Sequence, residues 1–170
     1  YERSKMIEKA IEEQAGVDYE TEVVTSAKCE PLDRALVPYV TVKSEHFVLH
    51  GDQEDEANLH EALMWAERTL KICQVAFPWG APDGKWPNEW AFFPAKETYQ
   101  QVLKANQVPN LEWRLENTST CGIGNTVVAA TSGKQVLLDV AVRNVARPCS
   151  GLGSAGFSEG IGHTLLGMIF

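Results

Sequence analysis

Cysteine is scarce in this chain of 170 residues, and its placement excludes a disulfide-rich scaffold. The four cysteines are Cys29, Cys73, Cys121 and Cys149, and no two of them have the Cys-x-x-Cys spacing of a zinc knuckle. Cys73 lies on the apolar face of a predicted helix, where we expect a small buried side chain. Cys121 and Cys149 lie in glycine-rich turns, where a disulfide could form. The cysteines therefore predict neither a fixed disulfide pattern nor a cellular compartment.

Lysine and arginine are outnumbered by acidic residues, 15 against 23, which gives a formal net charge of −8. Residues 1–60 hold 14 acidic and 6 basic side chains, whereas residues 61–170 hold 9 of each. Nucleic-acid binding needs clustered Lys and Arg, so this distribution argues against it. We expect residues 1–39 to form an acidic N-terminal appendage that is solvated and partly flexible. An acidic docking surface is the alternative.

The chain also lacks an apolar run long enough to span a membrane, since its last run covers only residues 164–170. It contains no signal-like stretch, and the sequence predicts no localisation. A helix that ended on Met168, Ile169 and Phe170 would expose an apolar patch to water. We therefore expect this chain to be part of a longer protein, and the question of a following membrane segment stays open.

Two common catalytic patterns are missing as well. The glycine-rich run at residues 151–156 has no lysine at the position that a phosphate-binding P-loop requires. The same run lacks the Gly-x-Ser-x-Gly spacing of a hydrolase nucleophile. We expect it to be a flexible connection.

The hydrophobic pattern predicts an α+β fold, with a small mixed sheet packed by helices. The clearest helix covers residues 53–77, where Leu59, Leu63, Ala66, Leu70, Cys73 and Phe77 recur at steps of three and four. Further helices are predicted at 3–15, 95–106 and 134–147, and strands at 40–50, 90–94 and 122–131. Trp90 and Trp113 are expected in the core. The chain should end in two apolar helices, the second of which carries Glu159.

That last helix contains Glu159-Gly-Ile-Gly-His163, after Pro148 and Phe157. A Glu-Gly that follows a proline and a bulky apolar residue resembles the third-ligand helix of the gluzincin, or peptidase-MA-like, metallopeptidases. In that family a preceding helix carries His-Glu-x-x-His, and the later Glu completes the zinc site about sixteen residues beyond the second histidine. The resemblance implies that residues 40–170 form a gluzincin-like N-terminal catalytic subdomain that continues beyond the end of this chain.

The same spacing, counted back from Glu159, places Asp139, Val140 and Arg143 at the positions of the family's His, Glu and His. Arginine cannot lose its proton to become a metal ligand, and valine cannot activate a metal-bound water. The resemblance therefore implies that the zinc site has been lost and that the ordinary peptidase mechanism is absent.

The remaining candidate ligands each have a simpler interpretation. Glu159 and His163 are four residues apart on one helix face, so they are either vestigial metal ligands or an ordinary Glu–His pair. Asp139 would stand at the first ligand position, but it is also placed to pair with Arg143 on the same helix.

Three other histidines could be distant metal ligands or surface residues. His46 and His50 share one face of the predicted strand at 40–50 and could supply a metal ligand from a distance, although we expect them to be solvated. His60 is predicted to be a surface residue.

The resemblance, with its missing ligands, implies a noncatalytic pseudo-metallopeptidase domain that serves as a binding or scaffold module. Its partner would be another protein or other domains of the same longer chain, and no cofactor is expected. One alternative is an active zinc-dependent hydrolase or peptidase, with the metal held by Glu159, His163 and a further ligand that the sequence does not identify. A second alternative is a plain structural domain.

Overall fold

The computed structural model describes residues 2–76, 89–131 and residue 136. Their elements, in chain order, are α1 (Glu2–Ala15), β1 (Glu22–Val23), α2 (Glu30–Ala35), β2 (Val40–Lys43), β3 (Val48–Gly51), the 3-10 helix η1 (Gln53–Asp55), α3 (Glu56–Ala76), β4 (Glu89–Phe92), α4 (Lys96–Ala105), α5 (Leu111–Asn117), β5 (Thr120–Ile123) and β6 (Thr126–Ala129). The predicted helix at 134–147, apart from Val136, and the helix that carries Glu159 lie outside the described residues.

The strands form one mixed six-stranded sheet in the order β1-β2-β3-β4-β6-β5. The central pairs β3–β4 and β4–β6 are parallel, and the other pairs are antiparallel. Helix α3 connects β3 to β4, as a parallel pair requires a crossover connection. The expected mixed sheet packed by helices is therefore present.

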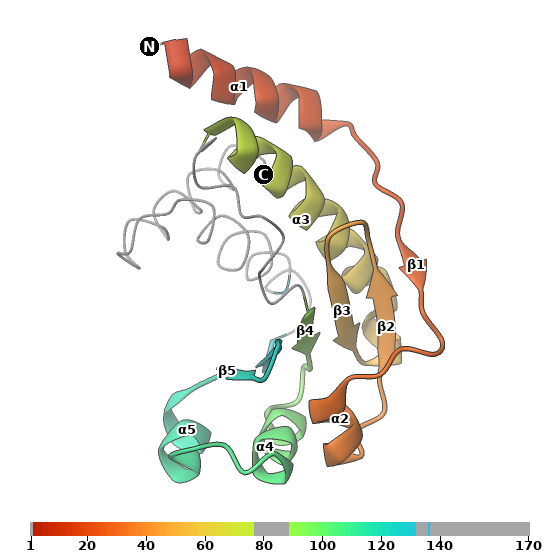
Figure 1. Cartoon of the computed structure of the whole chain (residues 1–170), viewed down its shortest axis with the longest axis vertical. Coiled ribbons are helices and arrows are strands. Elements are labelled where there is room, and N and C mark those ends of the chain that lie inside the picture. The colour runs from red at the N-terminus through yellow and green to blue at the C-terminus, as the bar shows by residue number, and fades with distance from the viewer. Residues whose placement is uncertain (1, 77–88, 132–135, 137–170) are drawn as a thin grey trace.

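Helices cover both faces of this sheet. The side chains of β4 alternate between two hydrophobic cores, one on each face. Trp90 and Phe92 pack with α3, whereas Ala91 and Phe93 pack with α2 and α4. Figure 1 shows α1 alongside α3, with α2, α4 and α5 grouped at the other side of the sheet. The apolar stripe of α3 is buried as predicted from Leu59 to Cys73, and its last predicted member, Phe77, lies outside the described residues.

The segment at 40–50 is a hairpin of β2 and β3, so the prediction of one strand was wrong. The chain reverses between Lys43 and Val48, where the amide of Ser44 donates to the carbonyl of Phe47 at 2.9 Å. Glu67 of α3 holds this turn from below by accepting hydrogen bonds from Ser44 and His46. The turn contains neither glycine nor proline, so the sequence offers no conventional sign that the strand is interrupted.

The predicted strand at 122–131 is likewise a hairpin, made of β5 and β6. Gly124 turns the chain with a φ of +59°, a conformation that favours glycine. Helices α2 and α5 were not predicted. The placement of Trp113 in the core was wrong, since this residue of α5 is 59% exposed, whereas Trp90 is buried as expected.

The acidic segment before residue 40 packs against the rest of the chain. Strand β1 pairs with β2, and α1 contacts α3. Cys29 and Leu32, at the start of α2, are fully buried in the core shared with α4. Within the described part of the chain, no helix has the length and apolar content needed to cross a membrane.

Candidate functional site

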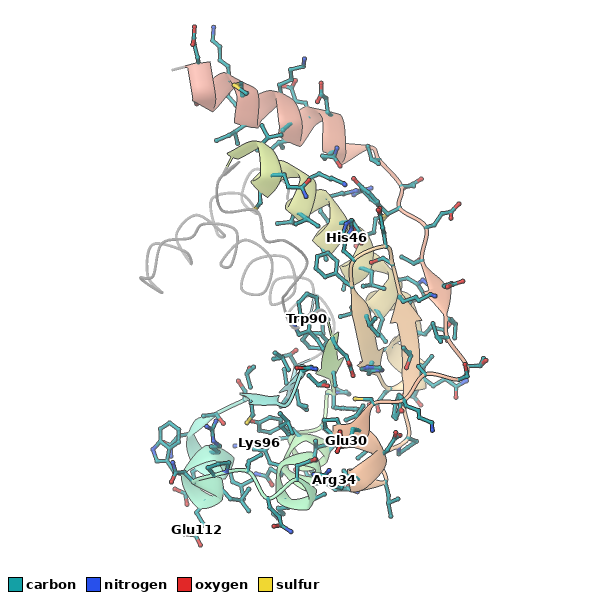
Figure 2. The ribbon with its side chains drawn as sticks, in the orientation of Figure 1. Glu30, Arg34, His46, Trp90, Lys96 and Glu112 are labelled. Carbon is teal, nitrogen blue, oxygen red and sulfur yellow. The ribbon has the colours of Figure 1, made fainter. Side chains whose placement is uncertain are left out.

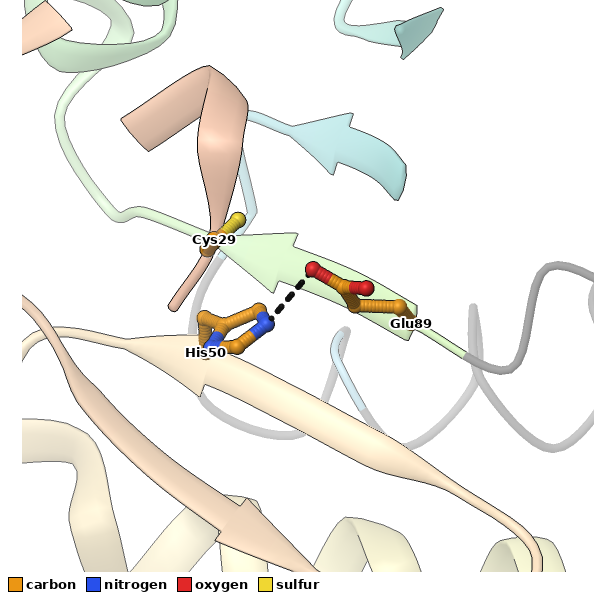
Figure 3. A group of neighbouring side chains, drawn as sticks. All are labelled: Cys29, His50 and Glu89. Carbon is orange, nitrogen blue, oxygen red and sulfur yellow. Dashed lines mark hydrogen bonds and ion pairs between the residues drawn. The ribbon is translucent and has the colours of Figure 1, made fainter. Parts of the chain in front are cut away.

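Among the described residues, a cluster of buried polar side chains lies on the sheet face beneath α2. Thr41 of β2 is the register partner of His50 of β3, and Glu89 of β4 is the register partner of Thr126 of β6. Cys29, the residue before α2, lies close to His50 and Glu89 and belongs to the same group. These residues are here named the Cys29 centre. Figure 3 shows that Cys29, His50 and Glu89 come from three separate segments of the chain.

Hydrogen bonds link the Cys29 centre into a chain. His50 Nδ1 lies 2.8 Å from Thr41 Oγ1, and His50 Nε2 lies 3.0 Å from Glu89 Oε1. Thr126 Oγ1 donates to the same Glu89 oxygen at 3.1 Å. The Sγ atom of Cys29 is 4.0 Å from Thr126 Oγ1. Because a carboxylate only accepts hydrogen bonds, Nε2 of neutral His50 carries its proton, and Thr41 donates to Nδ1.

Burial sets the protonation of this centre. His50 is 1% exposed, and burial lowers its pKa despite the opposing influence of Glu89, so the neutral imidazole is favoured. Burial also raises the pKa of the Cys29 thiol to about 12. Without a cation beside it, Cys29 is therefore a protonated thiol and a poor nucleophile.

The order hydroxyl, imidazole, carboxylate in Thr41, His50 and Glu89 has the connectivity of a hydrolytic triad. The nucleophile of such a triad must reach its substrate. Thr41 is only 3% exposed, and His50 is buried beside the Tyr39 ring at a centroid distance of 5.3 Å. This arrangement therefore supports the positioning of groups in the interior and not attack on an external substrate.

The Cys29 centre does connect with solvent on one side. Glu89, whose side chain is 30% exposed, lines a cavity of about 340 Å³ together with Thr126. Lys28, Glu30 and Arg34 lie around the same cavity, and Arg34 pairs with Glu30 on α2 (Figure 2). The carboxylate and the threonine hydroxyl are thus within reach of water and small ions.

A second polar group lies at the far end of the β2–β3 hairpin, beside α3. The carboxylate of Glu67 is fully buried and accepts from Ser44 Oγ at 2.7 Å and from the His46 amide at 2.8 Å. Its other oxygen lies 2.8 Å from His46 Nδ1. Glu45 is also near enough to share a metal ion with His46 and Glu67. Because the turn already occupies both oxygens of Glu67, its role is structural.

A larger hollow, here named the acidic cleft, lies between β1 and η1. It has a volume of about 890 Å³, and its apolar lining residues include Val23, Val24, Pro38 and Val40. Asp52, Glu54 and Glu56 also line it, and the described lining residues include no Lys, Arg or His. Burial, together with the nearby charges of Asp55 and Glu54, raises the pKa of Asp52. The cleft is therefore a site of crowded negative charge beside apolar surface.

Of the sequence-predicted site residues, Asp139, Glu159 and His163 lie outside the described residues, as does Arg143. His46 and His50 do not share a strand face, because His46 lies in the turn and His50 on β3. The expectation that His50 is solvated was wrong, since the core beneath α2 encloses it. His60 is partly buried, with Nδ1 2.6 Å from Thr21 Oγ1.

No motif in the sequence indicates a site at Cys29 and Glu89. Both residues are far from His50 in the sequence. They come close to it only because β4 lies beside β3 in the sheet and because Cys29 directly precedes α2, a helix that was not predicted. Comparison of the chain with models of protein families, with curated proteins and with solved structures found no match.

Proposed function

We propose that this chain is a noncatalytic domain of peptidase-MA-like descent that binds a basic segment of a protein partner in the acidic cleft. The observation that carries the proposal is the composition of this cleft, which Asp52, Glu54 and Glu56 line together with apolar residues. A segment that alternates Lys or Arg with apolar side chains complements both kinds of lining residue. Complementary charge provides specificity and speeds association, and the apolar side adds buried area.

The noncatalytic part of the proposal is supported by the Cys29 centre. Its threonine hydroxyl and its imidazole are buried, so neither group can reach an external substrate for covalent catalysis. The sequence adds that Val140 and Arg143 stand where a gluzincin would need its general base and a metal ligand.

One binding experiment tests both parts. A fluorescent peptide that alternates Lys with Val is titrated with the protein, and a matched peptide with Glu in place of Lys is the control. We expect saturable binding of the Lys peptide alone, weaker at high salt. Mass spectrometry of the same mixture should find the peptide intact. Cleavage that co-purifies with the protein would overturn the noncatalytic assignment.

The triple variant Asp52→Asn, Glu54→Gln, Glu56→Gln locates the binding. Each exposed charge contact contributes roughly 0.2–1 kcal/mol, so we expect affinity to fall about tenfold. The variant Glu8→Gln, Glu12→Gln, Glu13→Gln on α1 makes the same change in net charge at a distance and should retain affinity. Equal losses in the two variants would show a nonspecific charge effect and would contradict the cleft assignment.

The proposed descent has its own test. Replacing Asp139→His, Val140→Glu and Arg143→His restores the residue types of the gluzincin signature. We expect this variant to bind one more zinc ion per chain than the parent protein. An unchanged zinc content in a folded variant would argue against the alignment on which the descent rests.

A further inference from the structure

We infer that Cys29, His50 and Glu89 form a binding site for a single Zn²⁺ ion beneath α2. The site uses none of the residues that the gluzincin resemblance singles out, and it does not depend on the acidic cleft. Three observations support the site: the types of donor atom, the hydroxyl groups that orient them, and the match between the charges of the ligands and of the ion in a buried position.

The three donor atoms already lie together. One sulfur, nitrogen or oxygen from each of Cys29, His50 and Glu89 falls within 4.8 Å of the other two. Thiolate, imidazole and carboxylate are the ligand types that zinc takes in proteins, at bond lengths of roughly 2.0–2.3 Å. A set with one thiolate and one imidazole favours zinc over Mg²⁺ or Ca²⁺, which prefer oxygen donors throughout.

The surrounding hydroxyl groups orient these donors as outer-shell partners do in metal sites. His50 is held through Nδ1 by Thr41 at 2.8 Å, which leaves Nε2 directed at Glu89. The hydroxyl of Thr41 can either donate or accept, so it can accept from Nδ1–H when Nε2 binds a metal. Glu89 is held in turn by the hydroxyl of Thr126 at 3.1 Å.

Charge balance also suits a divalent ion here. Binding of Zn²⁺ releases the thiol proton of Cys29, and the proton of His50 Nε2 is replaced by one on Nδ1, so one proton leaves in total. Two anionic ligands, the thiolate and the Glu89 carboxylate, then neutralise the +2 charge of the ion. A neutral assembly is the arrangement that costs least to bury.

The cavity of about 340 Å³ supplies the route of entry and the remaining ligand. Glu89 and Thr126 line this cavity, so an ion that enters meets the carboxylate first. A water molecule beside Thr126 would complete four-coordination with the three protein donors. The Glu67 group, in contrast, has both carboxylate oxygens engaged by the turn.

The test is cobalt and zinc binding by the whole chain. Purified protein is stripped with a chelator and titrated with Co²⁺, which reports a bound thiolate through its sulfur-to-metal charge-transfer absorption. We expect this band to saturate at one Co²⁺ per chain and to disappear when Zn²⁺ is added. Failure of the folded protein to develop the band would overturn the proposal.

Variants assign the ligands. Cys29→Ser should abolish the charge-transfer band, and Glu89→Gln, which keeps the size of the side chain, should weaken Zn²⁺ binding by more than the roughly 10–100-fold expected for an outer-shell change. Thr41→Val is that outer-shell change and should fall within the stated range. Cys121→Ser, at another buried cysteine in the same core, is the matched control and should bind as the parent does.

Circular dichroism confirms that each variant is folded before it is titrated. Should Cys29→Ser fail to fold, Glu89→Gln and the control still decide the matter. Undiminished Zn²⁺ affinity in folded Glu89→Gln, or an equal loss in Cys121→Ser, would place the metal elsewhere and refute the site. None of these results depends on peptide binding, so the proposed function stands or falls separately.

Discussion

Glu67 shows how one side chain fixes a local fold. It lies on α3 with no exposed surface, and its two oxygens accept from Ser44 and from both the amide and the ring of His46. Figure 2 shows His46 at the α3 side of the hairpin, away from Glu30 and Arg34. A buried carboxylate is tolerated here because its hydrogen bonds replace those to water.

Replacing Glu67→Ala should lower the free energy of unfolding by about 2–4 kcal/mol, because it leaves the Ser44 hydroxyl and the His46 amide without their acceptor. Glu67→Gln, which keeps one carbonyl oxygen, should cost less. Urea denaturation followed by circular dichroism measures both. Glu61→Ala, on the exposed side of α3, is the control and should stay within about 0.5 kcal/mol of the parent. A Glu67→Ala protein as stable as this control would remove the structural role.

Asp52 should make stability depend on pH in the direction set by its raised pKa. The folded state then binds this proton more tightly than the unfolded state does. The contribution of Asp52 is therefore most favourable below the ordinary aspartate pKa and is lost as the pH rises through the raised value.

It follows that Asp52→Asn should stabilise the protein at pH 7, by less than about 1 kcal/mol because the site is largely solvated, and should have little effect at pH 3. Thermal unfolding at the two pH values measures this difference. Glu12→Gln on α1 controls for the loss of one charge. A stabilisation by Asp52→Asn that was the same at both pH values would contradict the assignment.

At this scale the sequence could not identify the Cys29 centre. Cys29, His50 and Glu89 belong to no common motif, and His50 follows an alternation that suits a half-exposed strand. Its burial depends on α2, whose six residues are too few to show a helical period. Glu159 and His163 do form a recognisable pattern, and their role as vestigial metal ligands remains a prediction.

Among the elements, α3 was the most predictable, because its buried face repeats over 21 residues. The hairpin of β2 and β3 was missed for a physical reason. Its turn contains neither glycine nor proline, and the group that stabilises it, Glu67, lies in another element. The hairpin of β5 and β6 could have been found, since Gly124-Asn125 is a recognised turn pair between two strands.

The contact between β3, β4 and α3 leaves no room at Gly51. A β-carbon there would lie 3.0 Å from the carbonyl oxygen of Phe92 and 3.2 Å from a methyl group of Leu59. We expect Gly51→Ala to destabilise the fold by about 1–3 kcal/mol, because the backbone of a central strand cannot easily move aside.

Gly122→Ala is the matched control for this substitution. Gly122 lies on the edge strand β5, with nothing within 4 Å of an added β-carbon. The control should be neutral or slightly stabilising, since alanine reduces the freedom of the unfolded chain. Equal effects of the two substitutions in urea denaturation would show that the spacing between β3 and β4 is not restrictive.

At the scale of the whole molecule, the acidic first segment contributes to the architecture. Arg68 of α3 donates to the carbonyl of Val17 at 2.8 Å and lies over the ring of Trp65 at 4.6 Å. Farther along, Cys29 and Leu32 complete the core under α2. These contacts cross the predicted domain boundary between residues 39 and 40 and join the first segment to the rest of the chain.

A chain that lacks residues 1–39 should lose cooperative unfolding, because the removal of α2 uncovers Ala91, Phe93 and His50. A chain that lacks only residues 1–16 loses α1 and should keep the sheet at reduced stability. Differential scanning calorimetry distinguishes these results. A sharp transition in the chain that lacks residues 1–39 would instead support an independent domain from residue 40.

The short strand β1, at one border of the sheet, affects how molecules can associate. Strand β1 has two residues, and its Glu22 forms an ion pair with Lys43 of β2 at 2.6 Å. A long, flat and apolar border would act as a template on which other chains could add strands. Here a neighbouring molecule finds few free backbone groups and a charged pair, so this border resists the lateral growth that leads to fibrils.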